Sequence, residues 1–482
     1  MMQNLLKRCS SGPAPLALIL FVCAVVFHFM KKLTLSFHTR DYPYYLVALD
    51  SRIGSLFGET RQLLLQPKGV NIFGFSGIDG FPYAHNDVHF SPLTYILSAG
   101  FQIGGEPLIV AFYAALSVLW AFQLSGYALR RPAEERKRTV IILALAGFFL
   151  QFCTYDLRVW IPLVGFTVLL AMAVDRDETP RKILFLALLT LFTREESVFF
   201  VGIAAAHLFW KRRYALALTV GLATVLNVVA GYLYFFKTTA FTFSFTARNL
   251  VFLAAPLMLF VALAGARAVA VYSLQLGRIA ALGLRVSAAG RRLYDRLFDS
   301  PFFVWINIYL FPLWANWATT KHNFKTLLSP RYMVLLFVVA CLIMRKVSLN
   351  SRRRAAIAYG VASVILIHSV VSARPATALK NLATGREVWA LSREIGHDTP
   401  IVTNFTYKQV FWNHSAVTVE RLPAESADDE ERAWPRNRRR LVPYIEAAEY
   451  VVLDNEGGAM IGSLLPERIK CAQAATVSIC RP

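Results

Sequence analysis

The chain has 482 residues, 56% of them hydrophobic, with a mean hydropathy of +0.47. The apolar residues recur in blocks, and the blocks near 20 residues could cross about 30 Å of hydrocarbon. The formal net charge is +21, but a nucleic-acid-binding function is excluded because the basic residues form short clusters between apolar blocks, as cytoplasmic loops do. The sequence therefore predicts a mainly α-helical, polytopic membrane protein.

The apolar blocks predict about eleven transmembrane helices. In chain order they cover residues 14–35, 107–129, 139–153, 159–174, 181–193, 197–210, 214–236, 249–266, 301–317, 331–344 and 355–372. With a cytoplasmic N-terminus, every dense basic cluster falls in an inside loop. Because the predicted count is odd, the C-terminal region then lies outside. No clear small-residue cleavage site follows the first block, which we interpret as a retained helix.

A long first outer loop is predicted over residues 36–91. Its early part, "DYPYYLVALDSRIGSLF", has apolar residues such as Leu46 and Leu49 on one helical face, as in a helix that lies in the membrane interface. Asp41 stands at the start of this helix. Its carboxylate could cap the helix or serve as an acid–base group, and the sequence leaves both roles open.

The same loop ends in the polar stretch "YAHNDVHFSPL". His85, Asp87 and His89 lie close together there and are candidates for a functional pocket at the membrane surface. A half-length apolar helix is predicted near 91–103, followed by a turn at Gly104–Gly105 and then by the second span.

Two further outer connections carry charge. "CTYDLRVW" contains Asp156 and Arg158, and it is either an ordinary polar hairpin or part of a site. In "TREES", residues 193–197, Glu196 fits a capping box with the threonine at its start, which leaves Arg194 and Glu195 unexplained.

The predicted helices on both sides of "TREES" are short. Either they extend into the flanking polar residues, or this junction dips below the outer membrane surface, where ionisable groups are functional candidates.

The charged candidates share the predicted outer side. They offer carboxylates for a general base and cations or imidazoles for a phosphate group. The full set is Asp41, His85, Asp87, His89, Asp156, Arg158, Arg194, Glu195, Glu196, Lys321 and Arg331.

The C-terminal region, residues 374–482, has a different pattern. "PATALKNLATGREVWALSREIG" predicts a helix, and "TPIVTN", "EYVVLDN" and "ATVSIC" predict short strands. We expect a small extracytoplasmic α/β domain after a transmembrane domain formed by residues 1–373. Cys471 and Cys480 share this polar region, so a disulfide between them is predicted. No CxxC or His/Cys cluster indicates a metal site.

Taken in order, these motifs resemble the GT-C superfamily of membrane glycosyltransferases. In particular, "HFSPL", "YDLRVWIPL", "TREES", "SPRYMVLLF" and "EYVVLDN" are similar to motifs of a prokaryotic membrane-protein family usually grouped with GT-C. The resemblance implies an inverting enzyme of the bacterial cytoplasmic (inner) membrane. Such an enzyme moves a sugar from a polyprenyl-phosphate donor to an extracytoplasmic acceptor, which can be a glycolipid, a polysaccharide or a protein.

The resemblance also implies residue roles. Asp41 matches the acidic residue of the first outer loop that deprotonates the acceptor, and Glu195 is a second catalytic candidate. Arg194, with Arg331 or Lys321, would hold the phosphate. The paired acids usual in the superfamily are absent beside Asp41, so no cofactor is expected and a divalent metal is not supported.

Two other functions stay open from the residues alone. A lipid or solute transporter would explain ionisable groups inside the membrane, but not the long first loop or the outer α/β domain. A catalytically inactive scaffold that binds a partner through the C-terminal domain would explain that domain, but not the clustered carboxylates and histidines.

Overall fold

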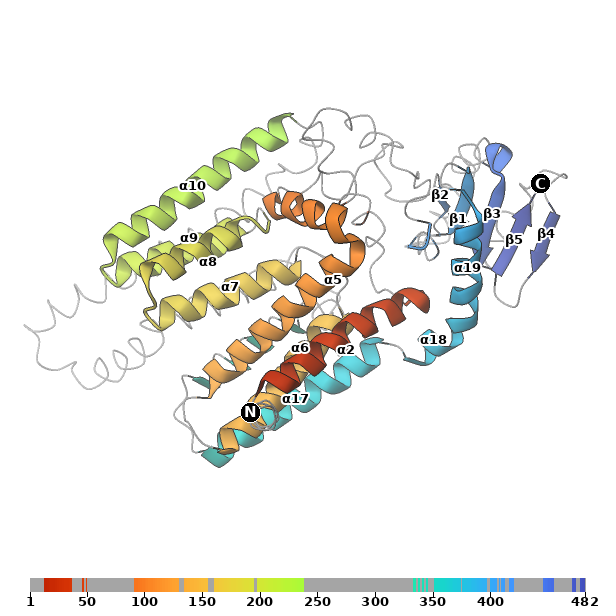
Figure 1. Cartoon of the computed structure of the whole chain (residues 1–482). Coiled ribbons are helices and arrows are strands. Elements are labelled where there is room, and N and C mark those ends of the chain that lie inside the picture. Colours follow the sequence, from red (N-terminus) through yellow and green to blue (C-terminus); the bar gives the residue numbers. More distant parts are fainter. Residues whose placement is uncertain are drawn as a thin grey trace, which may run out of the picture.

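Figure 1 shows a computed structural model of the whole chain. The residues that the structure describes are 13–36, 46, 49, 91–129, 134–154, 160–194, 197–237, 333–334, 337–338, 340–341, 344–345, 351–373, 375–396, 399–404, 407, 409–411, 416–419, 445–454, 470–473 and 477–481.

Long helices make up most of the described chain. They are α2 (Pro13–Leu33), α5 (Pro92–Ala128), α6 (Glu134–Thr154), α7 (Trp160–Asp175), α8 (Pro180–Leu191), α9 (Ser197–Trp210), α10 (Tyr214–Lys237) and α17 (Ser351–Ala373). All but α5 coincide with a predicted span to within about five residues, whereas α5 joins the predicted half-length helix near 91–103 to the predicted span at 107–129. The predicted spans at 249–266 and 301–317 lie outside the described residues, and that at 331–344 is described only in part.

The apolar core of the bundle lies around α5, which packs against α2, α6 and α7, while α17 packs against α6. Tyr113, Trp120 and Leu124 of α5 are fully buried there. The outer surface is apolar as well. Leu222 of α10 is 62% exposed and Ile367 of α17 is 65% exposed, which places their faces toward lipid.

Within the described residues, four helices are long and apolar enough to cross a membrane: α2, α5, α10 and α17. The chain is therefore an integral membrane protein, with a mostly helical fold.

Helix α5 is broken into two parts at Gly105, as the Gly104–Gly105 pair predicts. Gly105 has φ 62° and ψ −161°, a conformation open essentially only to glycine, and Pro107 follows it. The first part, residues 92–104, is the predicted half-length helix. Figure 1 shows it turned across the end of the bundle, at an angle to the spanning part of α5.

After α17 the chain forms α18 (Pro375–Lys380), α19 (Leu382–Glu394) and a five-stranded sheet. The strands are β1 (Ile401–Asn404), β2 (Ala416–Val419), β3 (Tyr450–Asp454), β4 (Lys470–Gln473) and β5 (Val477–Arg481). Their order in the sheet is β2-β1-β3-β5-β4. Strands β1, β2 and β3 pair in parallel, and β5 runs antiparallel to β3 and β4. We call α19 and these strands the sheet unit.

The sequence predicts α19, β1, β3 and β5, but it does not predict β2 or β4. In the sheet, Cys471 of β4 pairs directly with Cys480 of β5. Cys480 is disulfide-bonded. Directly opposed residues of antiparallel strands lie about 4.5–5.5 Å apart at their Cα atoms, within the range that a disulfide spans. The register thus fits the predicted bond.

Candidate functional site

The half-length helix of α5 begins against the "TREES" junction. The Leu93 amide donates a hydrogen bond to the Phe192 carbonyl over 2.7 Å, and the Ser91 hydroxyl donates to the Thr193 carbonyl over 2.6 Å. Pro92 occupies the first helical position, where its missing N–H costs nothing. The Ser91 side chain therefore does not cap its own helix but donates a hydrogen bond to the junction. Two motifs that are far apart in the sequence, "HFSPL" and "TREES", meet here.

This junction lies deep relative to the neighbouring helices. Helix α8 has 12 residues, which gives it a length of about 18 Å, less than the hydrocarbon thickness of about 30 Å. Beside it, the Asn227 amide of α10 donates to the Leu191 carbonyl over 3.2 Å. Asn227 is about 15 Å short of the end of α10 at Lys237. Of the two alternatives left by the sequence, the structure therefore favours the recessed junction.

Buried hydroxyl groups satisfy the backbone at this depth. Thr193 donates to the Thr190 carbonyl over 2.6 Å, and Ser197 donates to the Leu191 carbonyl over 3.3 Å. Thr94 donates to the Ser91 hydroxyl over 2.9 Å. Irregular backbone inside a membrane protein needs such partners because water is not available to it. The irregular backbone of the junction is thus held by specific hydrogen bonds within the protein.

Arg194 is the one predicted site residue that the structure describes, and it belongs to this junction. It is half-buried, and its carbonyl accepts the Ser197 amide over 3.0 Å. A guanidinium held at this depth suits a ligand with an anionic group, because arginine stays charged and binds phosphate in a bidentate manner.

The first outer loop contacts the same half-helix. Leu46 and Leu49 are helical and fully buried in the core of the bundle, and the Ser98 hydroxyl donates to the Leu49 carbonyl. Ser98 lies about 10 Å along the helix from Ser91. One half-helix thus contacts both the loop and the junction.

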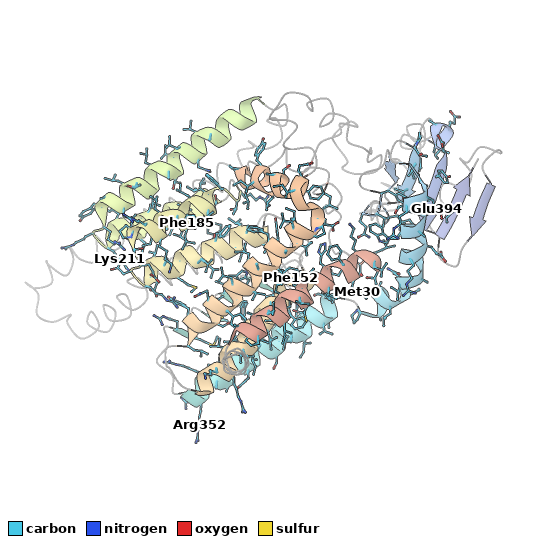
Figure 2. All side chains as sticks on the ribbon, in the orientation of Figure 1. Met30, Phe152, Phe185, Lys211, Arg352 and Glu394 are labelled. Atoms are coloured by element: carbon cyan, nitrogen blue, oxygen red, sulfur yellow. The ribbon has the colours of Figure 1, made fainter. Side chains whose placement is uncertain are left out.

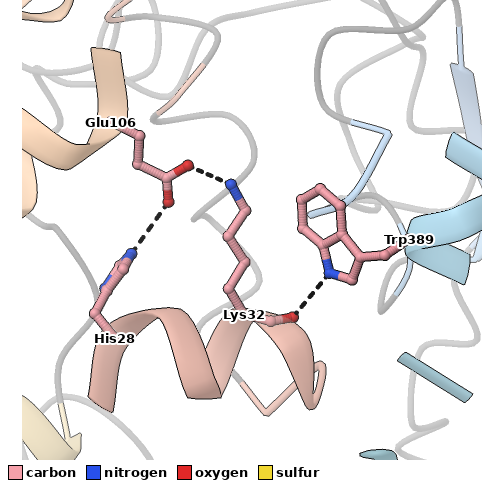
Figure 3. A network of polar contacts seen from close by, with 4 residues as sticks. All are labelled: His28, Lys32, Glu106 and Trp389. Carbon is pink, nitrogen blue, oxygen red and sulfur yellow. Dashed lines mark hydrogen bonds and ion pairs between the residues drawn. The ribbon is translucent and has the colours of Figure 1, made fainter. Parts of the chain in front are cut away.

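A second polar group, which the sequence does not predict, lies where α5 bends. Figure 3 shows the Glu106 carboxylate between His28 and Lys32 of α2, with Trp389 of α19 beside Lys32. The His28 Nε2 atom is 3.1 Å from Glu106 Oε1, and the Lys32 ammonium pairs with Glu106 Oε2. His28 and Lys32 are one helical turn apart, which was a usable signal, but each lies in an apolar segment far from Glu106 in the sequence.

Basic turns gather at the opposite end of the bundle. Arg213 pairs with Asp177 at 2.7 Å, Lys211 donates to the Val174 carbonyl over 3.0 Å, and Arg345 lies 3.9 Å from the Asp175 carboxylate. Figure 2 shows Lys211 at this end, away from Glu394 of the sheet unit. Arg213, Lys211 and Arg345 thus lie at the end of the bundle opposite the half-helix.

The other sequence-predicted site residues lie outside the described part of the chain, so the structure brings none of them together. They are Asp41, His85, Asp87, His89, Asp156, Arg158, Glu195, Glu196, Lys321 and Arg331. Among the residues that the structure does describe, no group of three His, Cys, Asp or Glu side chains could hold a metal ion.

These features define a polytopic membrane protein with a recessed polar junction under a half-length helix. No protein-family model matches the chain, and no curated protein matches its sequence. Two crystal structures are similar to it: ArnT from Cupriavidus metallidurans bound to undecaprenyl phosphate, and the same protein in the apo state. Each is 13% identical with a TM-score of 0.40, covering 96% and 97% of this chain and 97% and 98% of the ArnT chain. At 13% identity and a TM-score of 0.40, this likeness does not establish a function for the chain.

Proposed function

We propose that the chain is an inverting membrane glycosyltransferase, which moves a sugar from a polyprenyl-phosphate donor to an extracytoplasmic acceptor. One observation carries the proposal. The half-helix of α5 contacts the first outer loop through Ser98 and the recessed junction through Ser91. The segment that bears the proposed base and the segment that bears the proposed phosphate ligands are thereby joined to one element.

The donor requires an apolar path for its lipid chain and a cation for its phosphate. The lipid-facing helices supply the apolar path, and half-buried Arg194 supplies a cation at the junction. We assign Arg331 or Lys321 as its partner on the phosphate. Further substrate contacts are proposed for His85, Asp87, His89, Asp156, Arg158 and Glu196.

Asp41 is the proposed general base. In the sequence it lies between Ser36, the last described residue after α2, and Leu46, which is buried against the bundle. An acceptor oxygen attacks the anomeric carbon on the face opposite the phosphate. Its proton passes to the Asp41 carboxylate, the bond from carbon to phosphate oxygen breaks, and polyprenyl phosphate leaves with the charge that Arg194 stabilises. Glu195 is the alternative base.

The orientation is also part of the proposal. We place the end with the basic turns in the cytoplasm of a bacterium, and the half-helix and residues 374–482 outside. The sorting of Arg213, Lys211 and Arg345 to one end supports this, because positively charged loops are retained on the cytoplasmic side.

The test is Asp41→Asn, assayed in membranes supplied with polyprenyl-phosphate sugars. Asparagine caps a helix about as well as aspartate, so a mere cap would leave transfer unchanged. Loss of a general base should lower turnover by about 10²–10⁴-fold with expression and thermal stability unchanged. Asp177→Asn is the matched control, because Asp177 makes an exposed ion pair at the opposite end.

Three outcomes count against parts of the proposal. Full activity of Asp41→Asn would move the base to Glu195 or Asp87. Transport of a lipid or solute without transfer would favour a transporter. An absence of transfer from any polyprenyl donor by the unmodified chain, together with partner binding by residues 374–482, would favour a scaffold.

A further inference from the structure

The sheet unit packs against the last turn of α2. Leu35, just after α2, is buried in the same apolar cluster as Val388 and Leu391 of α19. Gly385 allows this approach, because a Cβ atom there would overlap with the Leu33 carbonyl oxygen. The end of the first membrane helix is therefore part of the core of the sheet unit.

Lys32 extends this contact to α5. The Trp389 indole N–H donates to the Lys32 carbonyl over 3.3 Å, and the Lys32 ammonium lies 4.9 Å from the centre of the Trp389 ring. The same ammonium pairs with Glu106, which also contacts His28 at 3.1 Å. This series of contacts, from Trp389 through Lys32 to Glu106, thus joins α19, α2 and the bend of α5.

Burying these ionisable side chains away from water costs free energy, so a specific role is needed to explain their buried position. His28 is 3% exposed, Lys32 8% and Glu106 9%. Burying an ion pair gives little net stability, whereas breaking one leaves an uncompensated charge. Such a network can therefore favour one arrangement of its elements over others even though it adds little to the stability of the fold.

Glu106 lies at the base of the half-helix, and its partners His28 and Lys32 lie near the point where the first outer loop begins. It directly follows Gly105, whose conformation sets the angle of the half-helix that carries Ser91 and Ser98. Its two partners lie on the last two turns of α2, and the first outer loop begins after Ser36. Because the Glu106 carboxylate pairs with both His28 and Lys32, a movement of Glu106 would change the position of the half-helix relative to the first outer loop.

We infer that Glu106 is a positioning residue for the proposed sugar transfer. Through His28 and Lys32 it holds the half-helix and the start of the first outer loop in register, with the sheet unit fixed at the same point. It touches neither donor nor acceptor. The inference rests on the proposed function, since it names a role within that reaction.

The experiment compares Glu106→Gln with the unmodified full chain in lipid nanodiscs. Glutamine keeps the size of the side chain and removes the charge. Amide hydrogen exchange should increase in residues 92–104 and 30–36, because both segments lose their shared anchor. The kcat of transfer should fall by about 10²-fold, as expected when reacting groups are displaced by about 1 Å, while the KM for the donor changes little.

Glu178→Gln is the matched control. Glu178 pairs with Lys182 at 3.1 Å at the other end of the bundle, where its side chain is 29% exposed. The Glu178→Gln variant should show unchanged amide hydrogen exchange and an unchanged kcat. If Glu106→Gln does not fold, the double variant Glu106→Gln, Lys32→Met removes both opposed charges. The same two measurements, amide hydrogen exchange and kcat, are then made on the double variant.

Unchanged exchange in residues 92–104 and 30–36 would overturn the inference whatever the activity. Increased exchange with an unchanged kcat per folded molecule would also overturn it, leaving Glu106 a purely structural residue. If the unmodified chain transfers no sugar, the proposed function fails, and the exchange result alone decides whether Glu106 anchors the two segments.

Discussion

At the scale of single residues, the polar groups inside the membrane were the hardest to predict. Arg194 stands out in the sequence because a charge between two short apolar helices is unusual. Ser91 and Glu106 do not stand out, because their partners are 102 residues away at Thr193 and 78 residues away at His28. A serine or a lone glutamate at the edge of an apolar block gives no local sign of such a partner.

Ser91→Ala should destabilise the junction specifically. The change leaves the buried Thr193 carbonyl without the hydroxyl that donates to it, at a cost of about 1–3 kcal/mol. Ser125→Ala is the control, because the buried Ser125 hydroxyl donates to the Ala121 carbonyl of its own helix. Thermal unfolding in detergent measures both. A midpoint shift no larger for Ser91→Ala than for Ser125→Ala would contradict the role given to Ser91.

At the scale of elements, helices were more predictable than strands. An apolar block of about 20 residues in a membrane has few alternatives to a helix, so α2, α10 and α17 follow from composition alone. The bend in α5 also followed, from the Gly104–Gly105 pair. Strands β2 and β4 have 4 residues each, too few for an alternating pattern to be visible. Strand β1 is as short, but its apolar pair Ile401 and Val402 follows Pro400 and so stands out as a bounded apolar run.

Gly105→Ala should disturb the angle of the half-helix. The observed φ of 62° and ψ of −161° are essentially closed to alanine, so the change should cost about 1–3 kcal/mol and reduce sugar transfer. Gly126→Ala, in the same helix, should be neutral or stabilising by up to about 1 kcal/mol, since a Cβ atom there meets nothing within 4 Å. Thermal unfolding and transfer assays on both variants check this. Equal behaviour of the two would show that the bend is not required.

At the scale of the whole molecule, the two ends differ in chemistry. Basic turns such as Lys211–Arg213 occupy one end, and the sheet unit, the Glu106 network and the recessed junction lie away from it. The sequence predicts this sorting because the positive-inside rule acts on all loops together. It does not predict that "HFSPL" would contact "TREES", because that contact depends on where the half-helix of α5 meets the junction between α8 and α9.

We propose that a polyprenyl phosphate binds where the half-helix of α5 meets the "TREES" junction, as the proposed function requires. Photoaffinity labelling with a diazirine-bearing polyprenyl phosphate, in nanodiscs with the full chain, tests it most directly. We expect labelled peptides within residues 91–104 and 190–200, with labelling competed by unlabelled polyprenyl phosphate and not by an equal amount of phosphatidylglycerol. Labels spread over the lipid-facing surfaces of α10 and α17, or equal competition by phosphatidylglycerol, would contradict it.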